Sequence, residues 1–339
     1  MKVVTFGEIM MRLQPQNNDR FLQAKSFDIV FGGGEANVAV SLSQLDNEVS
    51  FLTALPKNDL GKSCEMELKK WGVDTSKIIK NNNRLGIYFC EKGYGVRPSI
   101  VIYDRENSAF SNLSKEDINI EKVLKNVEWF HFTGITPAIN DNLADILVNI
   151  LEYCKKNNII VSCDLNYRAK LWTREKAKKV MSNLMQYVDV LIANEEDCSD
   201  VFGIHASETN IENGKLSIDG YKSICKSVEE MFNIKTVAIT LRESFSASVN
   251  GWSALLMQNG EFFVSEKYNL HVLDRVGGGD SFSAGLIDAL GRKLIGKNAI
   301  DFAVACSAIK HTINGDFNIL NKNEVEKLMK SGGNGRVQR

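Results

Sequence analysis

The chain has 339 residues, a length that gives a prior of about two domains, although one large domain with an appendage is equally allowed. Hydrophobic residues make up 44% and charged residues 24% of the chain, a balance that fits a globular protein with a sizeable core and excludes intrinsic disorder. Because 41 basic residues nearly cancel 42 acidic ones, no broad positive field is available, and we expect neither nucleic acid nor anionic lipid as a partner.

Short runs rich in β-branched residues alternate with helical patterns over the first two thirds of the chain. The predicted strands are residues 3–7, 49–55, 129–133, 159–164, 188–194 and 236–241. The predicted helices are residues 36–45, 61–71, 142–156, 173–186 and 221–232. This alternation predicts a parallel sheet covered by helices on both faces, an α/β/α fold.

Two stretches interrupt the alternation. Residues 12–30 are polar and turn-prone, and residues 85–91 and 98–103 are a pair of predicted strands around a turn at 92–95. We interpret residues 12–30 and 85–111 as a small β-sheet lid over the ligand cleft. The main α/β domain then consists of residues 1–11, 31–84 and 112–330. The alternative is that the lid strands are edge strands of the main sheet.

Further β-like runs follow the last strand of the alternating region, at residues 247–249, 254–257 and 262–264. Asn-Gly pairs at 250–251 and 259–260 predict turns between them. Helical patterns then begin at Ser281. The tail, residues 331–339, starts with several glycines and is predicted to be flexible.

The cysteines and the N-terminus bear on the cellular compartment. The seven cysteines are odd in number and contain no C-x-x-C pair, so we expect neither a disulfide framework nor a zinc site. The N-terminus leads directly into a predicted strand without the parts of a signal peptide, and no apolar run approaches the roughly 18 residues of a membrane span. We therefore expect a cytoplasmic protein.

The strongest chemical signal is the segment 274–285, DRVGGGDSFSAG. Gly277, Gly278 and Gly279 precede a helical pattern, so their backbone N–H groups can converge on an anion at the positive end of the helix. A carboxylate next to a bound phosphate is favourable only if it meets a proton. We therefore predict that Asp280 is a general base that deprotonates an attacking hydroxyl. The alternative is that Asp280 only caps the helix.

A second glycine run, GGGEANVA at residues 32–39, opens another predicted helix. Gly33 and Gly34 would allow close backbone approach to a polyol, and Asn37 offers it both a donor and an acceptor. A tight turn between strand and helix is the alternative. Neither glycine run fits a phosphate-binding G-x-x-x-x-G-K-[ST] loop or a dinucleotide fingerprint in its expected context, which disfavours a Rossmann dehydrogenase.

The two glycine motifs, in this order and near opposite ends of the chain, resemble the two signatures of the ribokinase, or PfkB, family of carbohydrate kinases. The similarity extends over nearly the whole chain, including residues 6–8 and 194–197. It implies a ribokinase-like α/β fold with a lid, ATP and Mg²⁺ as cofactors, and Asp280 as the catalytic base. Gly277, Gly278 and Gly279 correspond to the anion hole of the family.

The same resemblance implies two ion sites. Asn194 begins what resembles the N-x-x-E motif of the family, which influences Mg²⁺ and phosphate through water. Its fourth position is Asp197 in this chain, a shorter carboxylate, so the Mg²⁺ contact is less well defined. Asp274 resembles the start of the segment that surrounds an activating monovalent cation, such as K⁺, in many relatives.

Within the family, residues 164–172 resemble the D-x-N-x-R segment of 2-keto-3-deoxygluconate kinases, and residues 101–105 point the same way. Such a substrate carries a carboxylate, which a guanidinium can bind through two parallel hydrogen bonds. Arg105 and Arg168 are therefore the expected clamps, and Tyr88 and Tyr103 could bond to sugar hydroxyls. The alternatives are a solvated or ion-paired arginine and tyrosines that only pack.

The residues expected to bind ATP are Asn194, Thr240, Arg242, Gly277, Gly279 and His311, although many relatives have a lysine or glycine pattern near residue 242 that this chain lacks. His311 could equally be structural. The resulting hypothesis is phosphorylation of 2-keto-3-deoxygluconate by MgATP. A fructokinase or other sugar kinase, and a non-catalytic sugar-binding regulator, remain open. Because a sheet with one exposed face often pairs with its copy, we expect a homodimer formed through the lid.

Overall fold

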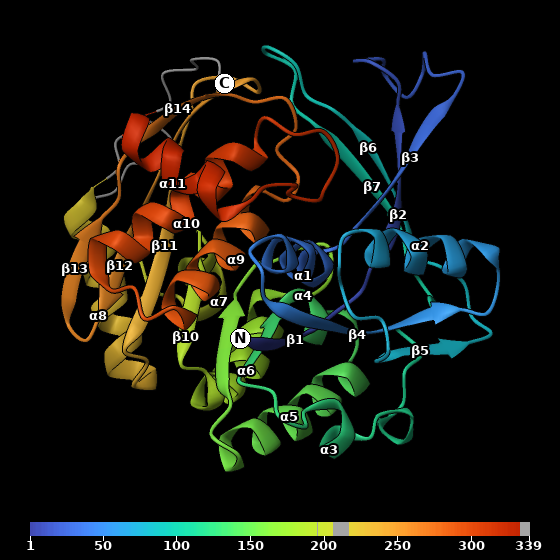
Figure 1. Cartoon of the computed structure of the whole chain (residues 1–339), viewed down its shortest axis with the longest axis horizontal. Helices are drawn as coiled ribbons and strands as arrows, with labels where there is room; N and C mark the ends of the chain where they lie inside the picture. Colours follow the sequence, from blue (N-terminus) through green and yellow to red (C-terminus); the bar gives the residue numbers. More distant parts are fainter. Residues whose placement is uncertain (195, 206–216, 333–339) are drawn as a thin grey trace.

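The computed structural model describes residues 1–194, 196–205 and 217–332 (Figure 1). Within these residues, ten strands form a central sheet in the order β13-β12-β11-β10-β9-β8-β1-β4-β5, with β14 paired to β12. The strands are β1 (Lys2–Phe6), β4 (Glu48–Pro56), β5 (Ile78–Asn81), β8 (Trp129–Thr133), β9 (Ile160–Asp164), β10 (Val190–Ala193), β11 (Thr236–Ser244), β12 (Val249–Gln258), β13 (Glu261–Val264) and β14 (Tyr268–His271). The strands from β11 to β5 run parallel, and the other three pair antiparallel.

Helices cover both faces of the sheet (Figure 1). One layer contains α1 (Gly34–Gln44), α2 (Asp59–Lys70), α9 (Gly278–Gly291), α10 (Gly296–Lys310) and α11 (Lys322–Ser331). The other contains α3 (Ile120–Val123), α4 (Ile135–Ile139), α5 (Asp141–Lys156), α6 (Arg174–Leu184), α7 (Asp197–Phe202) and α8 (Ile218–Phe232). Successive residues of a strand point to opposite faces, so Val3 joins the first core and Val4 the second. The predicted α/β/α arrangement is confirmed.

A separate sheet of four strands, which we call the lid, has the order β3-β2-β6-β7. Its strands are β2 (Met10–Pro15), β3 (Phe27–Gly32), β6 (Ile87–Glu91) and β7 (Ile100–Asp104). Figure 1 shows the lid rising from one end of the main sheet. Because the lid pairs with no strand of the main sheet in the described residues, the alternative of edge strands is wrong.

The boundary of the lid differs in one place from the predicted range 85–111. Ala109 and Phe110 are fully buried in the core of the main domain, where the ring centroid of Phe110 lies 5.3 Å from that of Phe6. These two residues therefore belong to the main domain. At the C-terminus, α11 ends at Ser331 with Gly332 as its left-handed cap, and residues 333–339 of the predicted tail lie outside the described residues.

The predicted turn at Asn250 and Gly251 is wrong, because both residues lie inside β12 and pair with β11. A Cβ atom at Gly251 would lie 2.9 Å from Oε2 of Glu243, so this glycine allows a close approach of side chains and does not form a turn. The second pair does form the predicted turn, with φ of 52° at Asn259 and 82° at Gly260. No helix of the described residues is long and apolar enough to cross a membrane.

Candidate active site

Asp280 lies in the first turn of α9, whose N-cap is Gly277 in the left-handed conformation with φ of 84°. The alternative that Asp280 is itself the N-cap is therefore wrong. Oδ2 of Asp280 accepts a hydrogen bond from Nδ2 of Asn37 at 2.7 Å, and Oδ1 of Asn37 accepts one from the backbone N–H of Gly33 at 3.3 Å. The two glycine motifs thus meet across 243 residues of sequence.

The environment of Asp280 suits a proton acceptor. Burial raises the pKa of Asp280 to about 6, although the hydrogen bond from Asn37 partly opposes this shift. A carboxylate with a pKa near this value is mostly ionised at neutral pH and can still hold a proton during a reaction. Oδ1 faces the second glycine motif, because a Cβ atom at Gly34 would lie 3.7 Å from it.

Both glycine motifs are close to Asp316, a buried residue that the sequence analysis did not identify. A Cβ atom at Gly32 would lie 2.0 Å from its carboxylate oxygen Oδ2, and a Cβ atom at Gly277 would lie 2.1 Å from its backbone oxygen. Glycine is therefore required at both positions for space, and at Gly277 for its positive φ as well.

Two cavities adjoin at the N-terminus of α9. The Asp280 cavity has a volume of about 300 Å³, and the Asn194 cavity a volume of about 380 Å³. The two cavities share five lining residues: Asn166, Arg168, Arg275, Gly278 and Gly279. The glycine turn therefore lies on the boundary between them, beside the carboxylate of Asp280.

All residues predicted to bind the substrate line the Asp280 cavity: Gly33, Gly34, Asn37, Tyr88, Tyr103, Arg105, Arg168 and Asp280. They come from α1 and the turn before it, from the lid, from the loop after β9 and from α9. The carboxyl ends of parallel strands meet at one edge of a sheet, and ligands of open α/β sheets bind there. The lid contributes its inner face, which carries the two tyrosines.

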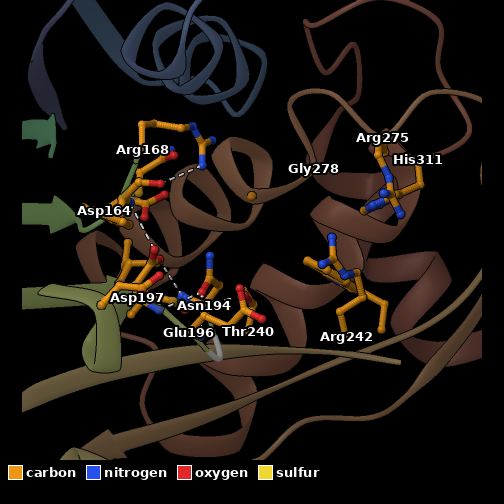
Figure 2. Close-up of a pocket in the computed structure, with 17 residues that line it drawn as sticks. Asp164, Arg168, Asn194, Glu196, Asp197, Thr240, Arg242, Arg275, Gly278 and His311 are labelled. Atoms are coloured by element: carbon orange, nitrogen blue, oxygen red, sulfur yellow. Dashed lines mark hydrogen bonds between the residues drawn. The ribbon is translucent and has the colours of Figure 1, made fainter. Parts of the chain in front are cut away.

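The Asn194 cavity is lined by Asn194, Asp197, Thr240, Arg242, Gly279 and His311, which the sequence analysis assigned to ATP or Mg²⁺ (Figure 2). Gly277, assigned to ATP as well, lines only the Asp280 cavity. In the view of Figure 2, Asp164, Glu196 and Asp197 lie on one side of Gly278, and Arg242, Arg275 and His311 on the other. Burial, and next the carboxylates of Asp197 and Asp280, raise the pKa of Asp164.

Arg105 and Tyr88, both predicted to bind the substrate, have carboxylate partners within the protein. Nη2 of Arg105 pairs with Oε2 of Glu8, whose carboxylate lines the same cavity. The hydroxyl of Tyr88 donates to Oδ2 of Asp316, so it can only accept a hydrogen bond from a ligand. One guanidinium nitrogen of Arg105 is therefore ion-paired, as the alternative expected, while the residue still lines the Asp280 cavity.

The side chains of the N-x-x-E-like motif are largely occupied by backbone N–H groups. Oδ1 and Oδ2 of Asp197 accept from the N–H groups of Tyr167 and Asn194 at 3.0 and 2.9 Å. Oδ1 of Asn194 accepts from the N–H groups of Glu196 and Asp197. In the described residues, no group of three His, Cys, Asp or Glu side chains could hold a metal ion.

Asp274, assigned to a monovalent cation, has other partners. Nη2 of Arg12 lies 2.8 Å from its Oδ2, and Nη1 of Arg12 lies 2.8 Å from Oδ1 of Asp316. Oδ2 of Asp274 also accepts from the N–H of Gly315, and Oδ1 accepts from the N–H of Val276. A fully buried guanidinium from the lid therefore already supplies positive charge at this carboxylate.

Comparisons with known proteins agree with this geometry. A family model described as pfkB family carbohydrate kinase matches residues 1–322. The chain belongs to the PfkB family of carbohydrate kinases. The 2-dehydro-3-deoxygalactonokinase of Haloferax volcanii is 29% identical over 335 residues, which cover 98% of each chain.

Two solved structures of PfkB-type kinases are also similar over nearly the whole chain. The 2-dehydro-3-deoxygluconokinase of Thermotoga maritima is 48% identical, with a TM-score of 0.94 and 98% of each chain covered. A PfkB family carbohydrate kinase of Listeria grayi is 34% identical, with a TM-score of 0.91, and the match covers 98% of this chain and all of that one. The resemblance seen in the two glycine motifs is therefore confirmed for the PfkB family and its fold.

Proposed function

We propose that this PfkB-family chain transfers the γ-phosphoryl group of ATP to the terminal hydroxyl of a sugar acid, most specifically 2-keto-3-deoxygluconate, giving the 6-phosphate and ADP. The observation that carries the proposal is the position of Asp280 beside the glycine turn, at the boundary of two adjoining cavities. One cavity is lined by residues suited to a sugar acid, and the other by residues suited to a nucleotide.

The chemistry follows from the position of Asp280. Its carboxylate takes the proton of the substrate hydroxyl while the hydroxyl oxygen forms a bond to the γ-phosphorus. The bond from that phosphorus to the bridging oxygen breaks, and ADP leaves with the electron pair. Backbone N–H groups of the glycine turn and the positive end of α9 stabilise the charge on the transferring group. Asp280 then returns its proton to water.

The substrate assignment depends on charge. Arg105 and Arg168 give the Asp280 cavity two guanidinium groups, and a ligand carboxylate offers each of them a charge-assisted partner. Glu8 neutralises part of the positive charge of Arg105, so Arg168 should contribute more to binding the ligand carboxylate. The names of the Thermotoga and Haloferax relatives, both kinases of 2-dehydro-3-deoxy sugar acids, support the same class of substrate.

The proposal includes Mg²⁺ with the nucleotide and treats a monovalent cation separately. Asn194, Glu196 and Asp197 line the cavity where Mg²⁺ would be held through water, and the ion would neutralise phosphate charge there. A K⁺ ion near Asp274 remains a prediction from the family. Since Arg12 occupies the carboxylate, such an ion would depend mainly on backbone carbonyls.

The lid offers a surface for a homodimer. Leu13, Ile29, Phe89 and Ile102 are cross-strand neighbours and therefore share one face, opposite to Arg12, Tyr88 and Tyr103. Ile29 is 61% exposed and Ile102 is 51% exposed. An apolar sheet face of this kind is covered in most soluble proteins. A second copy of the lid would cover it with an identical face.

We also propose a cytoplasmic location. All seven cysteines of the chain are buried free thiols, which is typical of proteins from reducing compartments.

An ADP-release assay over sugars and sugar acids tests the proposed function. We expect 2-keto-3-deoxygluconate to give the highest kcat/KM, with 2-keto-3-deoxygalactonate and fructose as the decisive comparisons. A clear preference for fructose would contradict the substrate, and no ADP release with any sugar would favour a non-catalytic regulator. Repeating the assay with tetramethylammonium in place of K⁺ tests the cation. A fall in kcat would support a K⁺ site on backbone carbonyls near Asp274, and an unchanged kcat would indicate that Arg12 alone supplies the positive charge there.

A further inference from the structure

Arg275 lies between Asp274 and the glycine turn, in a motif whose other charged residues already have roles. It lines both the Asp280 cavity and the Asn194 cavity. Figure 2 shows Arg275 and Arg168 on opposite sides of Gly278, the residue at the boundary of the two cavities. Two guanidinium groups from different elements therefore flank the point where a phosphoryl group would pass from one cavity to the other.

The guanidinium of Arg275 has a neutral partner. Its Nη2 donates to Oδ1 of Asn250 at 3.3 Å, and among the described residues it forms no ion pair. Burial, and next the positive charge of Arg242, lower the pKa of Arg275. A half-buried guanidinium near a second cation and without a carboxylate is unfavourable unless an anion neutralises it. The site therefore favours an anionic ligand at this position.

The distribution of charge indicates which anion. The carboxylates of Asp164, Glu196 and Asp197 lie on the side of Gly278 away from Arg275 (Figure 2). The side of Arg275 also carries Arg242 and His311, and burial followed by lesser effects, among them the charges of both arginines, lowers the pKa of His311 to about 4. A neutral His311 therefore adds no charge to the two guanidinium groups on this side. Phosphate oxygens of a nucleotide match this side of the cavity.

We infer that Arg275 is a further catalytic residue, whose guanidinium binds the γ-phosphoryl group of ATP and stays bound to it as it moves toward the substrate hydroxyl. The inference rests on the proposed kinase function. Arg275 exchanges no proton and forms no covalent bond. Its N–H groups neutralise the oxygens of the phosphoryl group while the bond to the substrate oxygen forms and the bond to ADP breaks.

Asn250 is the positioning residue for this arginine. It is 2% exposed, its Nδ2 donates to the backbone oxygen of Ser246, and its Oδ1 accepts from Oγ of Ser244 as well as from Arg275. The amide is thus fixed on both sides within β12. Holding Arg275 in place is thus a role for Asn250, which the sequence analysis assigned to a turn.

The decisive experiment compares Arg275→Met with Arg20→Met in the full-length protein. Arg20 is exposed and lines neither cavity, so its replacement removes the same charge from a surface position outside the site. For Arg275→Met we expect kcat with the accepted sugar acid to fall about 10²- to 10³-fold. In calorimetry without sugar, ATP should bind about 10- to 100-fold more weakly, and ADP less than about threefold more weakly. Arg20→Met should match the wild type in all three measurements.

Equal losses of ATP and ADP affinity would overturn the inference, because Arg275 would then bind the phosphates that stay on ADP. A kcat within about threefold of the wild type would also overturn it. If Arg275→Met does not fold, Arg275→Lys keeps the charge without the fork of donors, and an unchanged kcat with an unchanged ratio of ATP to ADP affinity would count against the role. The binding ratio remains informative even if the wild type accepts none of the sugars, an outcome that contradicts the proposed function alone.

A double-mutant cycle tests Asn250. Asn250→Ala should lower kcat by about tenfold in the wild type and have no further effect in Arg275→Met, because both changes remove the same contact. Equal losses in both backgrounds would show that Asn250 acts on the structure of β12 and not through Arg275.

Discussion

Nδ2 of Asn37 lies 2.7 Å from Oδ2 of Asp280, so the first turns of α1 and α9 share one polar contact inside the Asp280 cavity. The amide leaves the other carboxylate oxygen facing Gly34 and the cavity. This contact fixes the side chain of Asp280 and lowers its pKa relative to burial alone.

Asp280→Asn should abolish phosphoryl transfer while sugar binding persists. Asparagine keeps the shape of the side chain but accepts no proton at the reacting oxygen, so we expect kcat to fall by about 10²-fold or more. Calorimetry should give a sugar affinity close to that of the wild type. Normal turnover by this variant would show that another group is the base.

The dependence of kcat/KM on pH should report the ionisation of Asp280. The base must be ionised, and its pKa is about 6, so activity should decline as the pH falls below this value. Asn37→Ala removes a hydrogen bond that stabilises the carboxylate, so its acidic limb should move to higher pH. An acidic limb at the same pH in both proteins would contradict the assignment to Asp280.

Arg168→Gln should discriminate between acidic and neutral sugars. A guanidinium bound to a carboxylate contributes about 1.5–3 kcal/mol, so we expect KM for the sugar acid to rise about 10- to 100-fold. If fructose is accepted at all, its KM should change much less, because it offers no carboxylate. Equal effects on both substrates would indicate that Arg168 acts on the phosphoryl group alone.

Replacing Ile29 with Glu should separate the proposed dimer. A carboxylate at position 29 would be buried against an apolar face in the dimer, so its desolvation opposes association. Light scattering at micromolar concentration should give the dimer mass for the wild type and the monomer mass for Ile29→Glu. Met231→Glu, at an exposed apolar residue of α8, is the matched control and should remain dimeric. A monomeric wild type would refute the prediction.

The sequence was sufficient for β1, β4, β8, β9, β10 and β11, because these strands are largely buried on both faces and read as continuous apolar runs. It missed the short strands β5 and β14 and placed a turn inside β12. In the lid, the sequence assigned residues 12–30 to a β-sheet but did not delimit β2 and β3, because strands with a polar inner face and an irregular connection resemble a polar loop. Arg12 illustrates the difficulty: a charged residue in such a stretch is expected to be exposed, yet it is fully buried between two carboxylates.

The two glycine motifs located the candidate active site, because backbone requirements leave a local signature in the sequence. Asp316 left none. Its carboxylate meets Arg12 and Tyr88, which lie 304 and 228 residues earlier in the chain, so only the folded structure brings the three together. Arg275 was within the strongest motif, but its neighbours in sequence do not reveal that it lines both cavities.

The contacts of Asp316 also limit how the active site can open. Arg12 on β2 and Tyr88 on β6 bind the same carboxylate, so both central strands of the lid are held to the main domain near their first residues. Lifting the whole lid as a rigid body would break the ion pairs of Arg12 with Asp274 and Asp316 and the hydrogen bond from Tyr88 to Asp316 together. Substrate entry should therefore occur by bending of the outer strands β3 and β7 while β2 and β6 stay in place. Hydrogen exchange should then be slow at the amide of Arg12 and faster along β3 and β7.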